Sequence, residues 1–86
     1  MAHMDDDTKR IATVLDGLTG LTEAVSLLAL AMVAHGMVNG DDLADSFERA
    51  SEAAQKQNRP VSKSILDSVA DAARAAAAQM KGETLV

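Results

Sequence analysis

Apolar residues recur at heptad spacing between Ile11 and Met32, and this pattern constrains the fold more than any other feature of the sequence. Alternating steps of three and four residues place the side chains on one stripe of a long α-helix. An exposed stripe of this kind is unfavourable in water, so the pattern predicts that the helix associates with a partner. The stripe consists of Ile11, Val14, Leu18, Leu21, Val25, Leu28 and Met32.

The helix that carries this stripe is predicted to span about residues 7–35. The acidic run at 5–7 lies where negative charge favours a helix N-terminus, and Gly36 follows at a position that commonly ends a helix. Gly17 and Gly20 fall inside the range and leave open a division into two helices. The second half is apolar on nearly all sides, so we expect its own chain to cover one face and another chain the other.

Two shorter helices are predicted at about residues 42–57 and 60–81. Asp41 or Asp42 is the expected N-cap of the first, and Pro60 suits the first position of the second. Both helices are expected to fold back over the second half of the long helix, leaving its first half uncovered. Their apolar stripes are Leu43, Phe47, Ala50 and Ala54 in the first, and Leu66, Val69, Ala73, Ala76 and Met80 in the second.

The composition indicates one small domain whose own core is too small to make it stable as a single chain. The chain has 86 residues, 48% of them hydrophobic, but many of these are alanines and only one residue is aromatic. A core of this kind is marginal in a single chain. We therefore predict an all-α helical bundle completed by dimerisation through the first helix. Residues 1–3 are interpreted as an expression-tag remnant, 4–82 as the helical domain and 83–86 as a frayed tail.

The sequence offers little for catalysis. It has no cysteine, and His35 is the only histidine outside residues 1–3. No glycine spacing matches a phosphate-binding loop, and no serine has a nucleophile context. We therefore predict a non-enzymatic protein without metal or cofactor. The net charge of −5 disfavours binding to nucleic acid or anionic membranes. The sequence has no run of about 20 apolar residues that would predict a membrane span. We expect a cytoplasmic protein of bacterial or phage origin.

Three functions remain open. The first is a small interaction, adaptor or regulatory module that works by homodimerisation and protein binding. The second is a DNA-binding regulator, because residues 61–65 resemble the start of a recognition helix in repressor-type helix-turn-helix domains. The third is an acidic inhibitor that mimics nucleic acid and occupies a basic groove. The candidate docking surface for a basic partner is an acidic ridge formed by Asp41, Asp45, Glu48 and Glu52.

Overall fold

The protein is described here by a computed structural model that covers residues 2–82, with side chains from Asp6 onward. The described residues form three α-helices: α1 at Ala2–Ala34, α2 at Gly40–Lys56 and α3 at Pro60–Met80. The prediction of an all-α, three-helix fold is confirmed. The predicted C-terminal tail at 83–86 lies outside the described residues.

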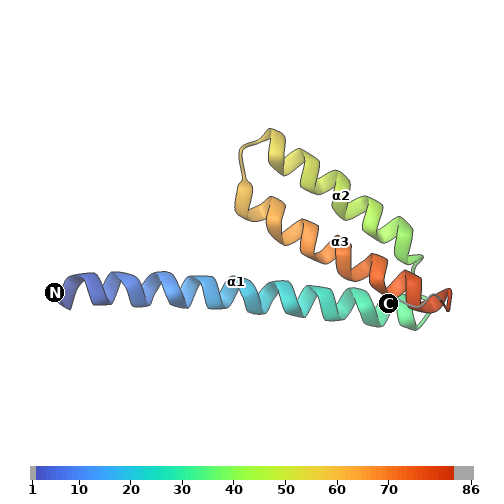
Figure 1. The fold of residues 1–86 in the computed structure, drawn as a ribbon, viewed down its shortest axis with the longest axis horizontal. Helices are drawn as coiled ribbons and strands as arrows, with labels where there is room; N and C mark the ends of the chain where they lie inside the picture. Colours follow the sequence, from blue (N-terminus) through green and yellow to red (C-terminus); the bar gives the residue numbers. More distant parts are fainter. Residues whose placement is uncertain (1, 83–86) are drawn as a thin grey trace.

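The helix α3 lies between the other two helices (Figure 1). It packs side by side with α2 as an antiparallel hairpin, and its other side rests on the second half of α1. The prediction that both shorter helices cover α1 was therefore wrong for α2, which forms an outer layer. The reason is that alanines of α3 itself lie on more than one of its faces, so a second helix can pack against it on each of two faces.

The core between the helices is built from small side chains. Its buried apolar residues are Ala29, Val33, Ala44, Ala54, Val69, Ala70, Ala73, Ala76 and Ala77. On α2, Gly40, Ala44, Ser51 and Ala54 are buried, whereas Leu43 and Phe47 of the predicted stripe are only half-buried. The predicted stripe is thus rotated from the buried one, because the smallest residues allow α2 to approach α3 most closely.

The long helix is continuous. α1 runs through Gly17 and Gly20 without a break, and it begins five residues before the predicted start. The acidic run at 5–7 lies inside the helix instead of capping it. Each internal glycine costs up to about 1 kcal/mol relative to alanine, which is too little to divide a helix with good helix formers on both sides.

The helix ends follow recognisable capping motifs. Gly36 adopts φ +71° and ends α1. Its N–H donates to the Val33 carbonyl at 3.0 Å, and the Met37 N–H donates to the Met32 carbonyl at 2.9 Å, which together make a Schellman motif. The N-cap of α2 is Asn39, whose side chain accepts from the Asp42 N–H at 3.0 Å. The prediction of Asp41 or Asp42 was wrong because helix α2 starts earlier, at Gly40.

Candidate functional site

The apolar stripe of α1 is largely exposed in the single chain. Five of its members, Ile11, Val14, Leu21, Val25 and Leu28, are between 41% and 65% exposed, and Leu18 and Met32 are half-buried. Large apolar side chains gathered on one exposed face are uncommon on monomeric proteins and mark interaction sites. We call the seven stripe residues the α1 seam.

The seam is exposed because α3 contacts a neighbouring face of α1 and covers only part of its length. Ala29 and Val33 of α1 are buried and Thr22 and Ser26 are half-buried, and α3 is the helix that packs most against α1. Every described side chain of α1 from Asp6 to Gly17 is exposed. The first half of α1 therefore extends beyond the rest of the chain, as Figure 1 shows.

A cleft of about 480 Å³ opens where α3 diverges from α1. Its apolar lining comes from Leu15 and Leu18 on α1 and from Pro60, Val61 and Ile65 on α3. Thr19, Thr22, Glu23, Ser64 and Ser68 add polar groups. Leu15 directly follows the stripe residue Val14, but the sequence pattern carries no information on the angle at which α3 leaves α1. The cleft was therefore missed.

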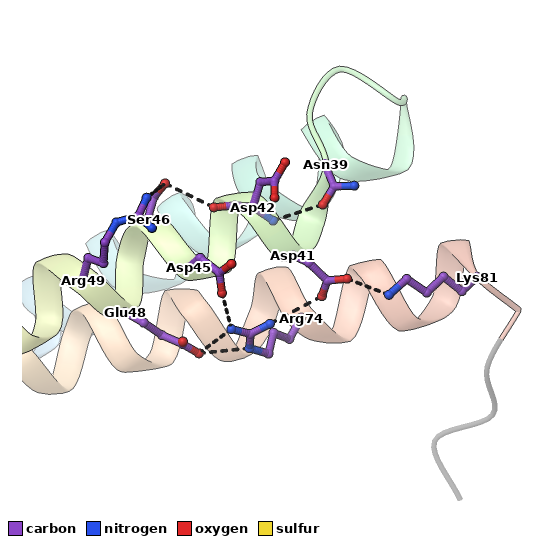
Figure 2. Close-up of polar contacts among 9 residues, drawn as sticks. All are labelled: Asn39, Asp41, Asp42, Asp45, Ser46, Glu48, Arg49, Arg74 and Lys81. Carbon is purple, nitrogen blue, oxygen red and sulfur yellow. Dashed lines mark hydrogen bonds and ion pairs between the residues drawn. The ribbon is translucent and has the colours of Figure 1, made fainter.

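Three members of the acidic ridge of α2, Asp41, Asp45 and Glu48, lie along its edge with α3 (Figure 2). Arg74 donates to Asp45 at 2.7 Å and to Glu48 at 2.9 Å, and its Nη1 lies 3.4 Å from Asp41. Lys81 donates to the second oxygen of Asp41 at 2.6 Å. Three of the four ridge carboxylates are therefore paired within the chain, whereas Glu52 lies farther along α2 and is exposed.

These pairs change the protonation behaviour of the groups that form them. The hydrogen bond from Lys81 lowers the pKa of Asp41 from its ordinary value of 3.8. Hydrogen bonds to Glu48 and Asp45 raise the pKa of Arg74, so the guanidinium stays charged at all working pH values. Two cations of the same molecule, Arg74 and Lys81, thus offset much of the charge that a basic partner would have to recognise. The ridge as a docking surface stays a prediction.

A second polar cluster joins α2 to α3 nearer the other end of the hairpin. Ser51, a residue that is 2% exposed, donates its hydroxyl hydrogen to Asp67, and Lys63 donates to the other oxygen of Asp67 at 2.6 Å. The hydrogen bonds from Lys63 and then Ser51 lower the pKa of Asp67. Asp67, Arg74 and Lys81 are spaced by seven residues, so Asp67 and Arg74 lie along one edge of α3 and Lys81, the residue after its end, continues that edge.

The remaining candidates do not assemble into a reactive site. His35 is exposed in the turn after α1, and its backbone N–H donates to the Ala31 carbonyl at 3.0 Å. Among the residues that the structure describes, no group of three or more histidine, aspartate or glutamate side chains could hold a metal ion. The predicted absence of catalysis stays a prediction.

The helix α1 also has a property that conflicts with the expectation that no segment is apolar enough to span a membrane. From Asp6 to Ala34 it is long and apolar enough, by length and composition alone, to cross a membrane. Core helices of soluble proteins and N-terminal signal sequences share these properties. The expected cytoplasmic location and the absence of a membrane partner therefore stay predictions.

The comparisons with known proteins assign no function. No protein-family model, curated protein or solved structure that was compared with this chain matches it.

Proposed function

We propose that this protein is a non-enzymatic helical interaction module that forms homodimers through the α1 seam. The observation that carries the proposal is the exposure of five large apolar seam residues on one face of a helix. Complete burial of a fully exposed side chain of this kind is worth about 1.5–3 kcal/mol, and these side chains are already partly covered, so roughly half of that is available from each when a second copy binds. The dimer would then present its outer helical surfaces to a protein partner.

The structure gives less support to a DNA-binding function. In helix-turn-helix domains the two helices cross at about 90–120°. Here α2 and α3 run side by side in opposite directions (Figure 1). Lys63, which lies in the candidate recognition segment, is paired with Asp67. Mimicry of nucleic acid is likewise less favoured, because Arg74 and Lys81 interrupt the acidic ridge.

The test compares two substitutions on different faces of α1. Leu21 lies on the seam and Leu27 lies off it, and both are 65% exposed. Leu21→Asp is expected to convert a dimer into a monomer, because it places a charge in the apolar interface. Leu27→Asp is the matched control and is expected to leave the dimer intact. Multi-angle light scattering of the full chain measures the mass of each variant.

Two results would contradict the proposal. One is a mass of a single chain for the unmodified protein at high micromolar concentration. The other is an equal loss of dimer in both variants, which would indicate general disruption of α1 in place of a specific seam. Circular dichroism of the variants shows whether the helices are retained.

A further inference from the structure

We infer that the two copies of α1 pair in antiparallel orientation, so that the first half of each α1 packs against the second half of the partner's α1 and against the partner's α3. This inference rests on the proposed homodimer and specifies its geometry. The partner chain would supply the cover that the first half of α1 lacks within its own chain.

The position of α3 on α1 favours the antiparallel arrangement. Leu15 lies at the edge of the seam nearest α3, as its place in the cleft beside Pro60 and Val61 shows. In an antiparallel pair this edge meets the same edge of the partner, whereas in a parallel pair it meets the opposite edge. The antiparallel pair therefore puts both α3 helices on one side of the paired α1 helices.

This placement covers the surfaces that a single chain leaves open. Each α3 would lie over the first half of the partner's α1, where Ile11 and Leu15 are 61% and 56% exposed. The α3 N-termini, including the exposed Val61, would meet near the two-fold axis and close the two clefts. A parallel pair would leave α3 on opposite sides of the α1 helices, with Leu15 and the clefts uncovered.

The area that becomes buried is sufficient for a stable dimer. Covering the seven seam residues and Leu15 would bury roughly 500–900 Å² of apolar surface per copy. A standard stable protein interface buries about 800 Å² per partner. Closure of the cleft adds to this area only in the antiparallel arrangement.

The charge distribution of α1 favours the same orientation. Three consecutive aspartates, at 5–7, lie near the start of α1 before the seam, and Lys9 and Arg10 offset part of their charge. A parallel pair would bring two such acidic runs together, whereas an antiparallel pair separates them by most of the helix length. Like charges that face each other destabilise an assembly, and antiparallel helix dipoles attract.

A second copy fits the seam better than a lipid surface does. Helices that lie on membranes usually carry lysine and arginine on the polar face, which anionic lipids attract. The described charged side chains of α1 are Asp6, Asp7, Lys9, Arg10, Asp16 and Glu23, so acidic residues outnumber basic ones, and both basic residues lie before the seam. Binding to a membrane would contradict the inference.

Because the chain has no cysteine, a single introduced cysteine can be labelled specifically. Thr8→Cys, at an exposed position near the start of α1, is labelled with a nitroxide, and the distance between the two labels of the dimer is measured by pulsed electron paramagnetic resonance. At a rise of 1.5 Å per residue, antiparallel pairing predicts about 35–45 Å between the labelled positions. Parallel pairing predicts less than about 20 Å, since paired helix axes lie 8–10 Å apart.

A second variant tests the contact with the partner's α3. Leu15→Asp is expected to raise the dimer dissociation constant at least about tenfold, because Leu15 would be enclosed by the partner. Leu27→Asp again serves as the control. Leu15 is exposed in the single chain, so the variant is expected to keep its helicity.

The outcomes separate the inference from the proposed function. A dimer with a short distance between the labels overturns the antiparallel geometry and leaves the dimeric module in place. A monomer in solution overturns both, and flotation of that monomer with phosphatidylglycerol-containing vesicles would assign the seam to lipid. A dimer with a long distance and a sensitive Leu15 supports the inference.

Discussion

At the scale of single residues, Gly40 controls how closely α2 approaches its neighbours. A Cβ atom added there would lie 2.7 Å from the Ala77 Cβ, 3.0 Å from the Ala73 carbonyl oxygen and 3.1 Å from a Val33 methyl group. All three helices therefore meet at this one position without room for a side chain. By contrast, a Cβ atom added at Gly20 would have nothing within 4 Å.

Substitution of these two glycines by alanine is expected to have opposite effects. Gly40→Ala should lower the free energy of unfolding by about 1–3 kcal/mol, because the backbone of Ala73 cannot move away easily. Gly20→Ala should raise it by about 0.5–1 kcal/mol, because alanine loses less conformational entropy within a helix. Urea unfolding followed by circular dichroism measures both, and a neutral Gly40→Ala would show that the helices are packed more loosely.

At the scale of helices, the edge between α2 and α3 is held by ion pairs that fix the register of the hairpin. Arg74 contacts carboxylates on two successive turns of α2, so a shift of α2 along α3 would break several bonds at once. The ion pairs are partly exposed, so each one alone contributes little to the free energy of unfolding. As a network they fix the position of α2 along α3.

Arg74→Met is expected to lower the melting temperature by roughly a few degrees, because it leaves three carboxylates close together without their shared cation. Arg49→Met is the control. It removes the same charge from an arginine whose side chain donates only to the Ser46 hydroxyl, at 3.3 Å, in the described part of the chain. Thermal melts of both variants in low salt measure the difference, and equal melting temperatures would argue against a role for the network.

The helices also show how far the sequence determines the structure. Heptad spacing, Pro60 and Gly36 predicted three helices and most of their ends, because periodicity and capping are local properties. The rotation of α2 and the partners of Asp41 and Asp45 were not predicted. Arg74 lies 29 residues from Asp45, and only the packing of the smallest side chains against α3 brings the two together. The exposed seam follows from the same tertiary packing, which leaves α2 away from α1.

At the scale of the whole molecule, the paired carboxylates of Asp41 and Asp67 make the stability of the fold depend on pH. The pKa values of Asp41 and Asp67 are lowered in the folded protein by Lys81 and Lys63. A group with a lowered pKa stabilises the fold fully above its ordinary pKa near 3.8, and this contribution is lost as pH falls through the folded-state value.

We therefore expect the free energy of unfolding to be maintained above about pH 5 and to decrease below about pH 4. Asp67→Asn should be less stable at neutral pH and should show a shallower decrease at acidic pH. Urea unfolding between pH 3 and pH 7 measures both slopes. Identical slopes in the two proteins would show that other carboxylates govern the acid response.

The alanine core has a consequence for the response of the molecule to temperature. Seven of its nine buried apolar residues are alanines, so unfolding of a single chain exposes little apolar surface. The heat capacity change on unfolding scales with that surface, and a small change gives a flat stability curve. A single chain would lose its structure gradually over a wide temperature interval, and the additional apolar area covered by a second copy would make the transition sharper.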